Sequence, residues 1–222
     1  MLSLDSVPSL PNAELLISLS GSLLYLQCVH TRPSVWRMSV KAGSTALLSA
    51  LSTTQNGPLL LSAALILGAA GDAFLAWDGD TTFLCGLGSF LAAHILYIIL
   101  FAQRGSGKGM ILGSSWRVVA ASFLVCAFAP VMLSALMPKV ARDLRLPILV
   151  YTSAIVMMVL AALTLDNPVV VSGAICFTVS DAVLSVDKFL VSSTSAHRHW
   201  MPYAVWILYY AGQLQIAVGL LD

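Results

Sequence analysis

Residues 59–77 read LLLSAALILGAAGDAFLAW, an apolar run that contains one carboxylate, Asp72. The run is about as long as a membrane-spanning helix, which needs about 20 mostly apolar residues. Residues 71–78 (GDAFLAWD) share the pattern small-Asp-Ala-x-Leu-small-x-Asp with residues 180–187 (SDAVLSVD). The chain therefore places a carboxylate in two separate apolar runs, as Asp72 and Asp181, and ionisable groups in such runs are usually functional or paired.

The composition is that of a membrane protein. Of the 222 residues, 59% are hydrophobic and only 9% are charged, whereas soluble globular proteins have about 25% charged residues. The formal net charge of +1 gives no indication of nucleic-acid binding. We expect membrane lipids around the chain and no nucleic-acid partner.

The apolar runs are separated by short breaks that carry proline, glycine and charge, as is typical of loops. The breaks leave no room for a soluble domain, so residues 1–222 are predicted to form a single integral-membrane domain. The fold class is all-α, a polytopic transmembrane bundle of about eight helices. The repeated octapeptide lies in the third and seventh runs, which leaves open an arrangement of two parallel four-helix halves. The predicted spans are 13–30, 35–53, 59–77, 82–103, 116–136, 146–165, 168–188 and 201–221.

Several polar side chains are predicted to share one layer of the membrane. Seven of the 11 Lys and Arg residues fall on one side of the predicted membrane and three on the other, which favours the richer side as cytoplasmic. At 1.5 Å per residue, Asp72, Lys41 and Asp181 lie roughly 8 to 10 Å from that side. Tyr151 lies roughly 8 Å and Tyr209 roughly 12 Å from the same side. Five spans thus bring polar groups to a similar depth.

Each of these residues also has a structural interpretation. The long stem of Lys41 would let its ammonium group reach the interface. The two aspartates could form structural ion pairs or hydrogen bonds between helices. His94, which lies somewhat deeper and is followed one turn later by Tyr97, could be a packing histidine, and Tyr209 an ordinary aromatic.

Metal and nucleophile signatures are weak. The four histidines and four cysteines do not have metal-ligand spacing. A zinc site would have to combine His94 with Asp72 and Asp181, which is a minority interpretation. No phosphate-binding glycine loop and no Gly-x-Ser-x-Gly motif occurs. We therefore expect no metal and no cofactor.

A set of motifs covers the predicted spans 2 to 8 in order, and on these residues the chain resembles the YhhN-like lysoplasmalogenase family of integral membrane hydrolases. Ala42 follows the span-2 lysine where that family often has proline. The matching residues are Lys41, Gly71-Asp72-Ala73-Phe74-Leu75, Phe83-x-x-Gly86-x-x-x-Phe90-x-x-x-His94-x-x-Tyr97, Arg145-x-Pro147-x-x-x-Tyr151, Ser180-Asp181-Ala182-x-Leu184, Lys188-Phe189 and Tyr209-Tyr210-x-x-Gln213.

The resemblance implies a hydrolase acting on ether bonds in a lyso-ether phospholipid. Its substrate would be lysoplasmalogen, with an ethanolamine or choline head group. The products would be a fatty aldehyde and glycerophosphoethanolamine or glycerophosphocholine. Resemblance to eukaryotic members implies the endoplasmic reticulum, while a bacterial cytoplasmic membrane fits the residues equally well. The sequence leaves open whether the chain forms a homodimer.

Vinyl ethers are cleaved by acid through an oxocarbenium ion, so the reaction needs a proton donor and a counter-charge. Two carboxyl groups in different environments divide such roles in glycoside hydrolysis. Asp72 and Asp181 are therefore the predicted catalytic residues, without an assignment of which one is the acid. The predicted binding and supporting residues are Lys41, His94, Tyr97, Tyr151, Tyr209 and Gln213.

Three other functions remain open on the residues alone. Buried Asp, Lys and His also occur in proton relays, so a small proton-coupled transporter is one alternative. A membrane hydrolase of another lipid, such as an ester or amide and with or without zinc, is a second. A family member that binds lipid without catalysis is the third.

Overall fold

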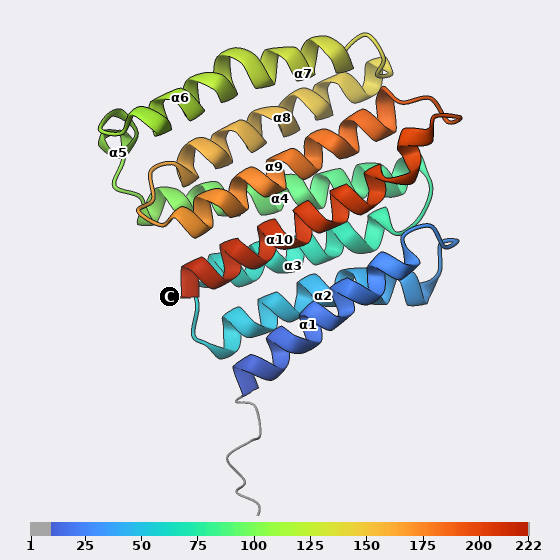
Figure 1. The fold of residues 1–222 in the computed structure, drawn as a ribbon, viewed down its shortest axis with the longest axis horizontal. Helices are drawn as coiled ribbons and strands as arrows, with labels where there is room; N and C mark the ends of the chain where they lie inside the picture. Colours follow the sequence, from blue (N-terminus) through green and yellow to red (C-terminus); the bar gives the residue numbers. More distant parts are fainter. Residues whose placement is uncertain (1–9, 222) are drawn as a thin grey trace, which may run out of the picture. The chain divides into compact units, whose positions relative to one another are not determined.

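The computed structural model describes residues 10–221, and within them every regular element is helical, which confirms the all-α prediction (Figure 1). The chain divides into two compact units with a boundary inside α4: the first reaches Phe90 and includes Leu221, and the second runs from Leu91 to Leu220. Each unit is described by itself. The elements are α1 (Leu10–Cys28), α2 (Val35–Thr54), α3 (Leu59–Leu75), α4 (Asp80–Arg104), α5 (Lys108–Leu112), α6 (Ser115–Phe123), the π-helix η2 (Leu124–Phe128), α7 (Ala129–Leu136), α8 (Arg142–Ala162), α9 (Pro168–Phe189), the 3₁₀-helix η3 (Ala196–His199) and α10 (Met201–Leu221).

All eight predicted spans are helical, and five of them are long and apolar enough to cross a membrane. These five are α4, the continuous segment Ser115–Leu136, α8, α9 and α10. The apolar part of α1, Ala13–Cys28, and helix α3 are shorter. Helix α2 has 20 residues but carries many serines and threonines. The crossing of the membrane by α1, α2 and α3 therefore stays a prediction.

Hydroxyl groups and small residues join the first three helices, which explains the polar character of α2. Ser18 of α1 donates to the carbonyl oxygen of Ser44 at 2.6 Å. Ser49 of α2 donates to the carbonyl oxygen of Ser62 on α3 at 2.8 Å. A Cβ on Gly21 would lie 2.8 Å from the Ser44 hydroxyl oxygen, so α1 and α2 approach closely. Small residues and interhelical hydrogen bonds of this kind hold membrane helices together.

In the second unit, α8 packs against α7 and α9, and α9 crosses α10 at two glycines (Figure 1). A Cβ on Gly173 would lie 2.8 Å from the Gly212 carbonyl oxygen, and the reverse contact has the same distance. Ser180 also donates to the carbonyl oxygen of Val205 at 2.8 Å. The two backbones therefore touch directly, as in small-residue crossings of membrane helices.

The predicted span 116–136 is one continuous helical segment, Ser115–Leu136, that contains a π-turn. The N–H of Ala129 donates to the carbonyl of Leu124, five residues earlier. The next residue, Pro130, has no N–H and its ring crowds the preceding turn, which disturbs the regular helical pattern. The other differences are small: α8 begins at Arg142 instead of 146, and α5 forms in a predicted loop.

A buried arginine fastens α6 to the end of α8. Arg117 is 6% exposed. Its Nη1 atom donates to the carbonyl oxygens of Leu163 at 2.6 Å and Leu165 at 2.7 Å. These carbonyls follow the last turn of α8, where helical acceptors lack partners and cations are favourable. The contact gives the buried guanidinium two hydrogen-bond acceptors and gives both carbonyl oxygens a donor.

Candidate functional site

The first predicted catalytic residue, Asp72, lies on α3 and is held by two residues of α2. The Lys41 Nζ atom is 3.4 Å from Oδ1, and the Thr45 hydroxyl donates to Oδ2 at 2.8 Å. Lys41 and Thr45 are four residues apart, so they share a face of α2. Asp72 is only 1% exposed, which makes this a buried, charge-compensated carboxylate.

Lys41 is mostly enclosed by the same unit. Its side chain is 12% exposed, and its Nζ atom lies 5.7 Å above the centre of the Tyr25 ring. An ammonium group at this distance from an aromatic face is attracted by the ring electrons. Lys41 therefore pairs with Asp72 and lies over the Tyr25 ring.

A glycine next to Asp72 allows close packing between α3 and the start of α4. A Cβ on Gly71 would lie 2.6 Å from the Phe90 ring. On the facing helix, a Cβ on Gly86 would lie 2.9 Å from Leu75. The Gly-Asp pair of the repeated motif thus combines a tight helix contact with the carboxylate beside it.

The second predicted catalytic residue, Asp181, lies on α9 among aromatic residues of the second unit. The Tyr151 hydroxyl of α8 donates to Oδ2 at 2.9 Å. The Nε2 atom of His94 on α4 is 3.7 Å from the same oxygen. Asp181 is 8% exposed and His94 is fully buried. A phenol and an imidazole therefore surround this carboxyl, in contrast to the ammonium group beside Asp72.

Aromatic edge-to-face contacts fix the orientation of His94. Its ring centre is 5.3 Å from that of Tyr151 and 4.7 Å from that of Phe177. Phe177 in turn meets Tyr209 edge to face at 5.2 Å. Such pairs contribute beyond the area that they bury, so the imidazole is held by rings on two sides.

A buried hydrogen-bond chain joins α4 to α10. The Tyr97 hydroxyl donates to the side-chain oxygen of Gln213 at 2.6 Å. The side-chain nitrogen of Gln213 donates to the Tyr209 hydroxyl at 3.4 Å. Gln213 and Tyr97 are fully buried. Because Tyr209 also contacts Phe177, this chain lies next to the surroundings of Asp181.

The structure thus groups the predicted site residues within each unit. Lys41 is with Asp72 in the first, and the other predicted residues gather around Asp181 and Gln213 in the second. The prediction that the two aspartates divide the roles of acid and counter-charge stays a prediction. Between residues 10 and 221, no three His, Cys, Asp or Glu side chains are grouped as metal ligands would be.

Three residues of these surroundings, Thr45, Tyr25 and Phe177, were not predicted from the sequence. Thr45 could have been found from its position four residues after Lys41, which places both on one helix face. Phe177 lies four residues before Asp181 by the same rule. Tyr25 gave no comparable signal because its contact with Lys41 depends on how α1 packs against α2.

Comparison with known proteins gives related sequences along most of the chain. A lysoplasmalogenase of Mycobacterium bovis is 30% identical over 164 residues, which cover 70% of this chain and 58% of that protein. Human lysoplasmalogenase TMEM86B is 29% identical over 187 residues, 84% of this chain and 69% of that protein. Lysoplasmalogenase TMEM86A of Bos taurus is 27% identical over 201 residues, 85% of this chain and 74% of that protein.

The match spans less than two thirds of the mycobacterial relative. No solved structure matches the chain. The five apolar helices and these relatives establish a multi-pass integral membrane protein. Residues 36–220 match the YhhN family, and the chain therefore belongs to that family.

Proposed function

We propose that the protein hydrolyses the vinyl ether bond of lysoplasmalogen. The observation that carries the proposal is that two buried aspartates have chemically different partners, an ammonium group at Asp72 and a phenol with an imidazole at Asp181. Support also comes from relatives in a bacterium, human and cattle that are named lysoplasmalogenase. The head group would be phosphoethanolamine or phosphocholine.

The reaction consists of proton transfer followed by addition of water. A carboxylic acid protonates the alkene carbon that is remote from the ether oxygen, and the electron pair of the double bond forms the new C–H bond. The resulting oxocarbenium ion takes up water at the adjacent carbon and loses a proton. The hemiacetal then collapses to a fatty aldehyde and the glycerophospho-alcohol. Two carboxyls that divide acid and counter-charge also serve glycoside hydrolysis.

We assign the counter-charge to Asp72. Lys41 and Thr45 contact different oxygens of this carboxylate, and both donors bind the ionised form. A fixed negative charge in a site without water is effective against a developing cation, because the interaction is little screened.

We assign the proton donor to Asp181. Its Oδ2 atom accepts from Tyr151, which leaves Oδ1 for a transferable proton. Tyr151 and His94 lie against this side chain, which is only 8% exposed, and a buried carboxyl suits the role of a general acid. His94, Tyr97, Tyr209 and Gln213 would orient the carboxyl, the attacking water or the head group.

The test is aldehyde release from lysoplasmalogen by the purified protein in detergent. The matched substrate is the ester-linked lysophospholipid, and a parallel reaction contains EDTA. Aldehyde from the vinyl ether alone, unaffected by EDTA, is the expected result. Turnover of the ester lipid with chelator sensitivity, or no aldehyde at all, would contradict the proposal and favour another hydrolase or a carrier.

The roles of the aspartates are tested by Asp72→Asn and Asp181→Asn. Each should reduce kcat by at least about a hundredfold. Asp78→Asn is the control, because Asp78 closes the same octapeptide and is exposed. Full activity in both buried variants would overturn the two-aspartate mechanism but leave the substrate assignment intact.

A further inference from the structure

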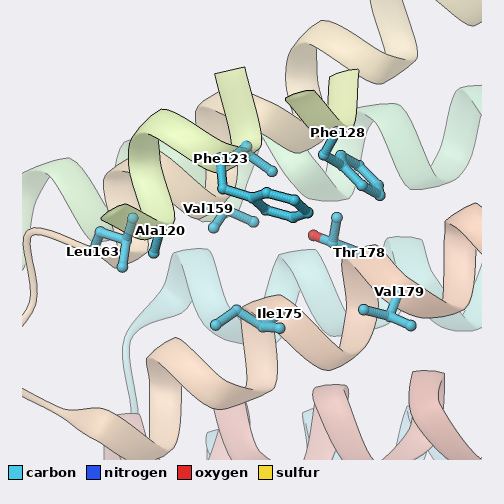
Figure 2. Close-up of a pocket in the computed structure, with 9 residues that line it drawn as sticks. Ala120, Phe123, Phe128, Val159, Leu163, Ile175, Thr178 and Val179 are labelled. Atoms are coloured by element: carbon cyan, nitrogen blue, oxygen red, sulfur yellow. The ribbon is translucent and has the colours of Figure 1, made fainter. Parts of the chain in front are cut away.

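A cavity of about 140 Å³ lies between the α6–η2 segment, α8 and α9. Figure 2 shows the rings of Phe123 and Phe128 on one side, facing Ile175 and Thr178 of α9. The Thr178 hydroxyl donates to the carbonyl of Ala174 at 2.9 Å, so it does not require a polar ligand. The remaining lining is apolar, and apolar cavities of about this size stay dry and accept hydrocarbon ligands.

The π-turn contributes directly to this cavity. Leu124 and Phe128 are the two ends of η2, and both line the cavity together with Phe123 just before it. A π-turn inserts one extra residue into a helical turn and changes the directions of the side chains around it. The cavity is thus built where the backbone departs from a regular helix.

The cavity has a buried floor and a rim exposed at the surface of the helices. Leu124 and Val159 are 7% and 5% exposed, whereas Phe123 is 61% and Val179 is 40% exposed. All four lie in helices that are apolar and long enough to span a membrane. The medium against this rim is therefore lipid hydrocarbon.

Two of the three α9 residues that line the cavity, Ile175 and Val179, lie on a different face of the helix from Asp181. At 100° per residue, Ile175 and Val179 are about 120° and 160° around the helix from Asp181, whereas Thr178 is about 60° away. Asp181 instead contacts Tyr151 and His94. The exposed rim at Ile175 and Val179 therefore lies away from the Asp181 carboxyl.

We infer that this cavity binds one hydrocarbon chain of a bilayer phospholipid, as a lipid site separate from the carboxyl face of α9. A volume of about 140 Å³ accommodates a segment of a few methylene groups, and the open rim lets the rest of the chain continue into the bilayer. No polar contact is needed, because a chain that fills the cavity gains dispersion contacts with side chains that otherwise border a void.

The test is photo-crosslinking of the full chain in nanodiscs that contain phosphatidylcholine with a diazirine on one acyl chain. Adducts are mapped by mass spectrometry. We expect several-fold more labelling at Phe123, Ile175 and Val179 than at Val119 and Met157, which are 68% and 52% exposed but do not line the cavity. Labelling that simply follows exposure would overturn the inference.

Two further arms identify the occupant. Ala120→Phe fills the cavity and should abolish the excess labelling, whereas Val119→Phe on the same helix should preserve it. Persistence of the excess in Ala120→Phe would contradict the site. Added lysoplasmalogen should not compete, and competition would mean that the cavity holds the substrate chain. The labelling pattern of the wild-type protein tests the inference even if a variant does not fold.

Discussion

Lys41 and Asp72 form an ion pair between α2 and α3, with Nζ 3.4 Å from Oδ1. Thr45, one turn after Lys41, donates to the other carboxylate oxygen at 2.8 Å. Both oxygens of a carboxylate that is 1% exposed are therefore engaged by the same neighbouring helix. Such a pair stabilises the unit only while both partners are present.

Lys41→Met should lower the free energy of unfolding by about 3 kcal/mol, because it leaves a buried carboxylate without its counter-ion. Thermal unfolding in detergent measures the loss. The double variant Lys41→Met/Asp72→Asn should recover most of the stability without recovering aldehyde release. If the double variant is no more stable than Lys41→Met, the ion pair is not the cause of the loss.

Tyr151→Phe removes one hydroxyl and keeps the ring beside His94. The hydrogen bond to Asp181 is lost, so kcat should fall by about a hundredfold, while stability should change by only about 1 kcal/mol. Steady-state kinetics and thermal unfolding measure the two effects. Tyr203→Phe, near the start of α10, serves as the control and should retain its activity. Unchanged kcat in Tyr151→Phe would remove Tyr151 from the proposed site.

Gly212→Ala should destabilise the second unit by about 1–3 kcal/mol through overpacking. The new Cβ would lie 2.8 Å from the Gly173 carbonyl oxygen and 2.9 Å from the Phe177 nitrogen, and neither backbone atom can move freely. Gly88→Ala is the matched control, because nothing lies within 4 Å of its added Cβ. Chemical unfolding of both variants should separate them clearly, and equal stabilities would mean that α9 and α10 are not in direct backbone contact.

Arg117→Met removes the donor to two carbonyls at the end of α8 and should cost about 2 kcal/mol. Arg117→Lys should recover only part of this, because an ammonium group lacks the planar fork of a guanidinium. The melting temperature in detergent is the measurement. A Met variant as stable as the wild type would show that the two hydrogen bonds to Leu163 and Leu165 carry no net stability.

The helices could be predicted from the sequence because each apolar run ends at proline, glycine or charge. Residues 201–221 form a helix with the predicted bounds, and 168–188 differs by one residue. The π-turn could not be predicted in the same way. Pro130 marks a disturbance of the helix in the sequence, but a proline can produce a kink as well as a π-turn, so its presence alone does not specify which one forms.

The candidate site was predictable as a set of residues but not as a set of contacts. Intramembrane charge singled out Lys41, Asp72 and Asp181, because an ionisable group is costly in an apolar run and is usually kept there for function or pairing. The pairing of Lys41 with Asp72 in particular required the structure. Thr45 was overlooked because hydroxyl residues are common in membrane helices, and α2 alone contains several.

The guanidinium of Arg117 has a consequence for the biosynthesis of the protein. Its two acceptors lie 46 and 48 residues further along the chain. Because synthesis proceeds from the N-terminus, α6 is exposed to the insertion machinery before these carbonyls exist. Arg117 can make both hydrogen bonds only after α8 and the residues that follow it have been synthesised, so the contact between α6 and α8 is completed late in synthesis of the chain.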